Sequence, residues 1–183
     1  MTKVAFLGMG VMGYPMAGHL AAAGHDVTVY NRTESKAAQW PREHLGSARP
    51  TPREAAAGQR IVFACVGNDD DLRAVCLGED GAFAGMDPGA LFVDHTTVSP
   101  TVTEELAAAA QAAGLRYVDA PISGGQAGAE NGVLTVMCGG TKADFDEAAP
   151  VIDAYAKKCR LIGPGGGGGR SQRAYGACCL RRL

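Results

Sequence analysis

A glycine-rich loop near the N-terminus has the composition and spacing of a phosphate-binding turn. Gly8, Gly10 and Gly13 form a G-x-G-x-x-G pattern directly after an apolar run, and a helical segment and a second apolar run follow. In such a unit the first glycine allows the tight turn, the second lets a pyrophosphate approach the backbone, and the third lets the helix pack against the strand. The helix N-terminus offers free N–H groups and partial positive charge. The pattern predicts a dinucleotide site; the alternative is a turn that binds nothing.

The residues at the end of the second apolar run indicate which dinucleotide is bound. NAD-binding units carry an acidic residue about 20 residues past the glycines, but this chain has Asn31, Arg32 and Thr33 there. A guanidinium can bind a ribose 2′-phosphate through a forked pair, whereas a carboxylate would repel it. A hydrogen bond to a charged group contributes about 1.5–3 kcal/mol, roughly a ten- to hundredfold preference. We therefore expect NADP(H) over NAD(H); the alternative is a solvated Arg32 and a Thr33 that only caps the next helix.

Length, charge and cysteine spacing exclude several classes of protein. The 183 residues suit one domain, and the net charge of −2 argues against nucleic acid or an acidic membrane surface as partner. Neither a run of about 18 apolar residues nor a signal-peptide pattern is present. None of the six cysteines forms a C-x-x-C pair, and three acids at residues 69–71 are expected to open a helix rather than bind metal. We expect a reduced, cytoplasmic protein without a metal site.

Strand and helix patterns alternate along the chain. Apolar runs predict strands at residues 4–7, 27–30, 61–66, 90–93, 116–119, 133–138 and 160–162. Besides the helix after the glycine loop, helices are expected at 33–40 with Pro41 as the stop, at 53–57, from 69 onward, from Ser99 as N-cap to about 113, and from Thr141 to about Ala156. The sum is a doubly wound α/β domain of the Rossmann type over residues 1–164, with a mostly parallel sheet.

Three motifs that follow one another in the chain resemble those of the β-hydroxyacid dehydrogenases. They are the glycine loop with Tyr14-Pro15-Met16, the sequence DAPISGG at 119–125, and GVLTVM at 132–137. This family includes 3-hydroxyisobutyrate, tartronate semialdehyde and 6-phosphogluconate enzymes, and the chain looks most like the first of these over residues 1 to about 164. The resemblance implies an NADP(H)-dependent oxidoreductase that moves a hydride to or from a small 3-hydroxy acid or semialdehyde.

The resemblance also assigns site residues by position. It implies cofactor contacts at Gly8, Met9, Gly10, Val11, Met12, Gly13, Asn31, Arg32, Thr33, Val66, Gly67, Asp71, Thr96 and Thr97. It implies a substrate-carboxylate site at Ser123, Gly124 and Gly125, where Ser123 orients the substrate and backbone N–H groups assist. Without the resemblance, the second set would be interpreted as an ordinary turn, and the two threonines could equally be helix-capping hydroxyls ahead of Pro100.

The sequence departs from the family after Pro164. In the family, the acid/base is a lysine shortly after the first domain, an asparagine lies one helical turn later, and an all-helical domain then completes the pocket and forms a homodimer or homotetramer. Residues 165–183 are instead rich in glycine and arginine, and no lysine follows Lys158. Five consecutive glycines cannot begin a stable helix. We interpret this tail as a frameshift or sequencing error that removes the helical domain, or alternatively as a natural linker, and expect it to be disordered.

This departure has consequences for the mechanism. Without an acid/base the chain forfeits the roughly 10²–10⁴-fold that such catalysis supplies, so we expect NADP(H) binding with weak or no turnover. Lys142, Lys157 and Lys158 are poor replacements by position, and His95 is the only histidine near the expected nicotinamide site. Two alternatives remain open: a non-catalytic NADP(H)-binding module, and a reductase of imines or short semialdehydes.

Overall fold

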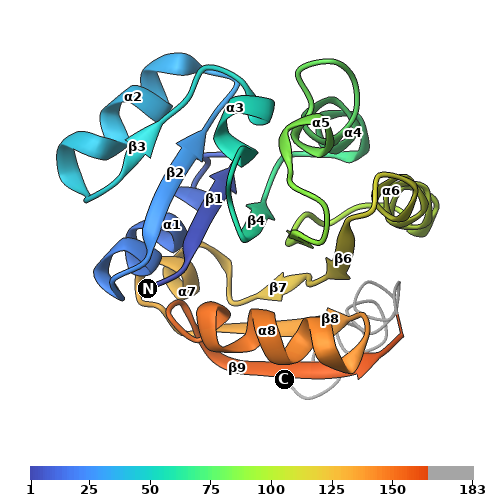
Figure 1. Ribbon diagram of the computed structural model, residues 1–183. Coiled ribbons are helices and arrows are strands. Elements are labelled where there is room, and N and C mark those ends of the chain that lie inside the picture. Colours follow the sequence, from blue (N-terminus) through green and yellow to red (C-terminus); the bar gives the residue numbers. More distant parts are fainter. Residues whose placement is uncertain (165–183) are drawn as a thin grey trace.

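The computed structural model describes residues 1–164 (Figure 1), and the expected tail at 165–183 lies outside the described residues. The strands are β1 (Lys3–Leu7), β2 (Asp26–Tyr30), β3 (Ser47–Ala48), β4 (Ile61–Ala64), β5 (Leu91–Asp94), β6 (Arg116–Asp119), β7 (Ile122–Ser123), β8 (Leu134–Gly139) and β9 (Ala156–Gly163). The helices are α1 (Gly13–Ala22), α2 (Glu34–Glu43), α3 (Pro52–Ala56), α4 (Asp69–Cys76), α5 (Ala82–Gly85), α6 (Pro100–Ala112), α7 (Gly125–Glu130) and α8 (Lys142–Ile152).

One mixed sheet runs through the described part of the chain. Its strand order is β3-β2-β1-β4-β5-β6-β8-β7, with β9 also paired to β8. The strands from β3 to β6 are all parallel, whereas β8 runs antiparallel to β6 and β7. The first six positions have the order of the doubly wound dinucleotide-binding fold, in which the strand order reverses between β1 and β4. The predicted Rossmann-type fold with a mostly parallel sheet is confirmed.

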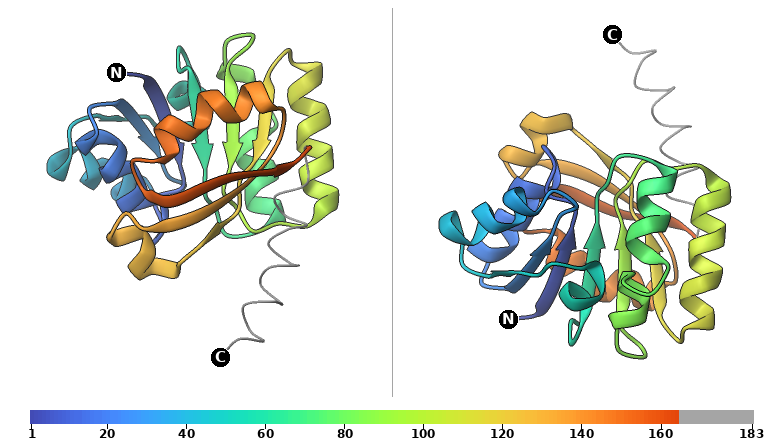
Figure 2. Two further views of the ribbon diagram at one scale, coloured as in Figure 1. Left: turned by 90° about the horizontal axis from the view of Figure 1, so that it is seen from below. Right: turned by 90° about the horizontal axis from the view of Figure 1, so that it is seen from above.

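Each face of the sheet carries its own apolar core. Successive residues of a strand point to opposite faces, and β1 divides accordingly: Val4 and Phe6 pack on one side, Ala5 and Leu7 on the other. The first core includes side chains of α1, α2, α7 and α8, and the second includes those of α3, α4, α5 and α6. Figures 1 and 2 show α8 on one side of the sheet and α4 to α6 on the other. A strand buried on both faces has a continuous apolar sequence, which is why apolar runs in the sequence located β4 and β5.

The expected stop at Pro41 is wrong, because α2 continues through this proline to Glu43. A proline in a helix removes one backbone hydrogen bond and disfavours continuation. Here the last turn is held by other contacts. Trp40 is fully buried, His44 N–H donates to the Trp40 carbonyl at 3.0 Å, and the two rings pack 5.0 Å apart. Tertiary burial of one large side chain therefore outweighs the local signal.

The end of α8 was also predicted wrongly. The helix stops at Ile152 rather than near Ala156, and Ala156 already begins β9, which is longer than the predicted strand at 160–162. Tyr155 lies between these elements and is fully buried, so the chain turns there to bring its ring into the core. The short elements β3, α5, β7 and α7 were not predicted, because two- to six-residue segments carry little periodicity.

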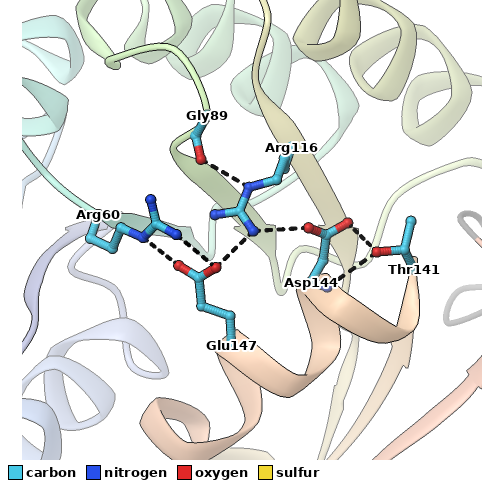
Figure 3. Close-up of polar contacts among 6 residues, drawn as sticks. All are labelled: Arg60, Gly89, Arg116, Thr141, Asp144 and Glu147. Atoms are coloured by element: carbon cyan, nitrogen blue, oxygen red, sulfur yellow. Dashed lines mark hydrogen bonds and ion pairs between the residues drawn. The ribbon is translucent and has the colours of Figure 1, made fainter.

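A polar network fixes α8 to the amino-terminal edge of the sheet (Figure 3). Arg116, at the start of β6, donates to Glu147 at 2.7 Å and to Asp144 at 3.1 Å, and both acceptors lie on α8. Arg60, just before β4, also pairs with Glu147. Hydrogen bonds from Arg116 and Arg60 lower the pKa of Glu147 and outweigh its partial burial. This network lies at the edge of the sheet opposite the glycine loop, so its role is to position α8 and not to contact the candidate site.

Candidate functional site

The glycine loop connects β1 to α1 at the carboxyl end of the sheet, and its three glycines differ in their surroundings. Gly8 has a φ of +101°, a conformation that side chains rarely adopt. A Cβ added at Gly13 would lie 1.9 Å from the Gly8 carbonyl oxygen, so the helix packs directly on the loop. A Cβ at Gly10 would meet nothing within 4 Å. Backbone atoms therefore leave no room for a side chain at Gly8 or Gly13, whereas the space beside Gly10, where a pyrophosphate would approach, is free of protein atoms.

The start of α1 carries neither a side-chain cap nor an acidic residue in its first turn. The N-terminal N–H groups of a helix need partners from caps, water or ligands, and they favour anions. Asn31, just after β2, stabilises the loop from the other side. Its Oδ1 accepts from the Met9 N–H at 2.9 Å and its Nδ2 donates to the Thr33 carbonyl at 3.0 Å. The residues present fit a dinucleotide whose phosphates lie on the loop.

A cleft of about 420 Å³ lies along the loop and the ends of β1, β2 and β4. It brings together most of the cofactor residues expected from the sequence, namely Gly8, Gly10, Val11, Met12, Gly13, Asn31, Arg32, Thr33, Val66, Gly67 and Asp71. Met9 does not line it, because its side chain is buried in the core. The cleft also includes residues that sequence reasoning missed: Tyr30, Lys36, Cys65, Ala74 and Val75. Of these, Lys36 adds a second cation near Arg32, and its position in the first turn of the predicted helix was the available signal.

The alternative interpretation, a solvated Arg32 and a Thr33 that only caps the next helix, agrees only in part with the structure. Thr33 occupies the N-cap position of α2 but its side chain makes no cap hydrogen bond. Arg32 is 80% exposed and pairs with Asp71 of α4, so it is neither free in solvent nor buried. The three residues expected on the ribose side of the cofactor, Asn31, Arg32 and Thr33, all line the cleft.

A smaller cavity of about 290 Å³ continues the cleft toward β7 and α7. It shares Met12, Cys65, Val66 and Gly67 with the cleft, and its other lining residues are His95, Thr97, Ile122 and Gly125. The structure therefore brings Thr97 and Gly125, which are 28 residues apart in the chain, to one cavity. Ser123 and Gly124, which lie between the lining residues Ile122 and Gly125 in the sequence, are exposed and line neither the cleft nor the smaller cavity.

Thr96 contributes to the site through the backbone of its neighbours. It is 4% exposed, its Oγ1 accepts from the Val66 N–H at 3.2 Å, and its own N–H donates to Asp94 Oδ1 at 2.8 Å. Thr96 thus holds Val66, a cleft residue, to the end of β5. The alternative role for the two threonines was helix capping. The N-cap of α6 is instead Ser99, whose hydroxyl accepts a hydrogen bond from the Val102 N–H.

Asp94 and His95 are buried titratable groups at the end of β5, and His95 also lines the smaller cavity. Burial raises the pKa of Asp94 to about 7, although hydrogen bonds from Thr96 and Tyr117 oppose this shift. His95 is 1% exposed, and burial lowers its pKa to about 4. Its Nδ1 lies 2.6 Å from the Ala120 carbonyl and its Nε2 lies 2.8 Å from the Tyr155 hydroxyl. Since a carbonyl only accepts, Nδ1 carries the proton and Nε2 accepts from Tyr155. Both ring nitrogens are engaged, which argues for a structural role and against a general base.

Asp94→Asn should change the pH dependence of stability. The pKa of Asp94 is higher in the folded than in the unfolded state, so this group lowers the free energy of unfolding as the pH rises from about 4 to about 7. The pKa of His95 is lower in the folded state, so this group raises the free energy of unfolding between about pH 4 and 6.5. The two slopes largely cancel in the native chain. In the variant the histidine slope remains, up to about 1.4 kcal/mol per pH unit. Urea unfolding across this range measures it, with the exposed Asp87→Asn as control; curves parallel to wild type would contradict the assignment.

Lys142, Lys157 and Lys158, the lysines weighed as replacements for an acid/base, line neither the cleft nor the smaller cavity. Lys142 pairs with Asp146 on the exposed side of α8, and Lys157 and Lys158 are exposed on β9. Within residues 1–164, no group of three His, Cys, Asp or Glu side chains is placed to hold a metal ion. No helix in that range is long and apolar enough to cross a membrane.

Comparison with known proteins decides the family. Residues 3–163 match the family model of the NAD binding domain of 6-phosphogluconate dehydrogenase. The chain belongs to this family. Several relatives are named as oxidoreductases or dehydrogenases. The match to the NAD-binding domain agrees with the position of the cleft at the point where the strand order reverses. The resemblance inferred from the three sequence motifs is thereby confirmed.

Individual relatives of this NAD-binding domain support the same conclusion. A protein named "Uncharacterized oxidoreductase" from Shewanella frigidimarina is 60% identical over 168 residues, which are 92% of this chain and 58% of the relative. The "NAD-dependent L-serine dehydrogenase" of Pseudomonas aeruginosa is 34% identical over 92% of this chain and 56% of its own length. The structure of Mycobacterium tuberculosis 3-hydroxyisobutyrate dehydrogenase with L-serine superposes with a TM-score of 0.90 at 32% identity, covering 98% of this chain and 60% of that one. The chain thus spans about three fifths of these relatives.

Proposed function

We propose that this chain binds NADP(H) in preference to NAD(H). The observation that carries the proposal is the guanidinium of Arg32 at the mouth of the cleft, with Lys36 lining the same wall. A ribose 2′-phosphate between these groups would gain charge-assisted hydrogen bonds that a 2′-hydroxyl cannot make. The glycine loop would hold the pyrophosphate, and the cavity beside Thr97 would take the nicotinamide end.

Exchanging the charge at Arg32 tests this proposal. Arg32→Asp removes the forked donor and places a carboxylate beside the phosphate, so NADPH affinity should fall at least tenfold while NADH affinity is retained or improved. Fluorescence titration of each reduced cofactor gives both dissociation constants. Arg49→Asp, a charge reversal at an exposed residue that does not line the cleft, is the matched control. Unchanged binding of both cofactors to Arg32→Asp would contradict the assignment.

The associated reaction is hydride transfer from a small 3-hydroxy acid to the oxidised nicotinamide or, in the reverse direction, from the reduced nicotinamide to the corresponding semialdehyde. L-Serine, a small 3-hydroxy acid, appears in the names of two relatives. Gly125, which follows Ser123 and Gly124 in the chain, lines the smaller cavity. When bound, the nicotinamide would accept the hydride in the oxidation and supply it in the reduction. The residues of this chain would position the two reactants, with the Ser123 hydroxyl and the N–H groups of Gly124 and Gly125 on the substrate carboxylate.

A proton donor or acceptor at the substrate oxygen is the remaining requirement of such a reaction. Two titratable side chains line the smaller cavity, where the substrate would lie, and neither is suited to this role. His95 has both ring nitrogens engaged, and burial raises the pKa of the Cys65 thiol to about 12. Residues 1–164 are therefore best described as the cofactor-binding unit of the enzyme, with weak or no turnover by themselves. A boundary of the cofactor-binding domain at residue 164 is part of the same proposal.

A further inference from the structure

An ion pair bridges the two walls of the cleft. Arg32 follows β2 on one wall and Asp71 lies in the first turn of α4 on the other. Arg32 Nη1 and Asp71 Oδ1 are 2.5 Å apart, and both side chains line the cleft. The pair therefore spans the position at which the proposed function places the 2′-phosphate of NADP(H).

The carboxylate is the anchored member of this pair. Asn68 caps α4, and its Oδ1 accepts from the Asp71 N–H at 2.9 Å while its Nδ2 donates to Asp71 Oδ2 at 3.2 Å. A Cβ on Gly67 would lie 2.9 Å from the same oxygen, so the carboxylate packs against a backbone that itself lines the cleft. Only 24% of the Asp71 side chain is exposed, against 80% for Arg32. A ligand that competes for the pair would therefore draw away the guanidinium and leave the carboxylate in place.

We infer that Asp71 is a specificity-determining residue that limits the preference of this cleft for NADP(H). Its carboxylate competes with a 2′-phosphate for the Arg32 guanidinium and repels that phosphate directly. NAD(H) carries a hydroxyl at this position, which neither competes for the guanidinium nor meets the repulsion. The hydroxyl can instead donate a hydrogen bond to a carboxylate, as it does to the acidic residue that ends the second strand in NAD-binding units. Asp71 thus supplies from α4 a charge that this chain lacks at the end of β2.

The expected effect of removing this charge is moderate. An exposed ion pair stabilises little, so Arg32 exchanges partners at low cost. The repulsion between a fixed carboxylate and a phosphate persists after the exchange, screened by solvent and salt. Asp71→Asn should therefore raise the ratio of NADH to NADPH dissociation constants about tenfold, chiefly through tighter NADPH binding. The inference rests on the proposed function, because it presupposes that the cleft binds both cofactors.

Titration of NADPH and NADH into Asp71→Asn and wild type tests the inference. The ratio of two dissociation constants from one preparation does not depend on the folded fraction, and Asp71→Ser repeats the test should the amide disturb the cap. Asp70→Asn is the matched control, because Asp70 is the preceding residue, is 95% exposed, pairs with Arg73 and does not line the cleft.

The outcomes separate the inference from the proposed function. A ratio raised about tenfold in both Asp71 variants and unchanged in Asp70→Asn supports a role for Asp71 in cofactor selection. An unchanged ratio at position 71, or an equal change at position 70, overturns the inference while the cofactor site stands. Wild type that binds neither cofactor overturns the proposed function itself.

Discussion

Replacing Gly10 with alanine is expected to weaken NADPH binding about a hundredfold and to leave the stability of the fold unchanged. The added Cβ meets no protein atom within 4 Å, and Gly10 has no positive φ, so alanine fits the native backbone. The methyl group occupies the space through which a pyrophosphate would approach the loop. Displacing the phosphates from the N-terminus of α1 forfeits charge-assisted hydrogen bonds worth about 1.5–3 kcal/mol each.

Fluorescence titration of NADPH together with thermal unfolding of the unliganded variant measures both parts of this prediction. Gly24→Ala is a control for the loss of a glycine at a surface turn, since Gly24 also meets nothing within 4 Å but lies away from the cleft. Its positive φ makes a small loss of stability expected there without any loss of affinity. NADPH binding to Gly10→Ala at wild-type affinity would mean that the phosphates do not lie on this loop.

Replacing Gly13 with alanine is expected to have the opposite signature, because the fold itself should lose about 3 kcal/mol of unfolding free energy. The added Cβ would lie 1.9 Å from the Gly8 carbonyl oxygen and 2.8 Å from the Phe6 ring. A backbone atom cannot move aside as a side-chain end can, so α1 must shift away from β1. The roughly 1 kcal/mol that alanine gains over glycine within a helix offsets only part of this cost.

Urea unfolding of Gly13→Ala beside Gly10→Ala measures the difference between two glycines of one loop. The first variant should unfold at a clearly lower urea concentration, and the second should coincide with wild type. Affinity in Gly13→Ala is expected to fall as well, because the shifted helix no longer presents its N-terminus to the loop. Equal stability of the two variants would show that the close approach of α1 to the loop is not required by the fold.

The part of the site that could be predicted from the sequence is the part built from adjacent residues. The glycine loop and the end of β2 are each contiguous, and glycine spacing and apolar runs report such local units directly. The parallel pairing of the longer strands β1, β2, β4, β5 and β6 followed from the alternation of strands and helices, whereas the two-residue strand β3 did not. The resemblance added Val66, Gly67, Asp71, Thr97 and Gly125, which line the cleft or the smaller cavity although no local signal marked them as site residues.

The contacts that could not be predicted join segments far apart in the chain. Nothing near Arg32 indicates that Asp71, 39 residues later, will pair with it. Thr96 was expected as a cofactor contact, but its burial and its bond to Val66 depend on how β4 and β5 lie side by side. The continuation of α2 through Pro41 likewise depends on the tertiary burial of Trp40. In each instance packing decides between local alternatives that the sequence leaves nearly equal.

Titration of the wild-type chain with NADPH and with NADH tests the central claim most directly. The account predicts saturable binding of one NADPH per chain, with NADPH tighter than NADH, by less than the roughly ten- to hundredfold that an unopposed Arg32 would give. Absence of binding by either cofactor, or tighter binding of NADH, would contradict it.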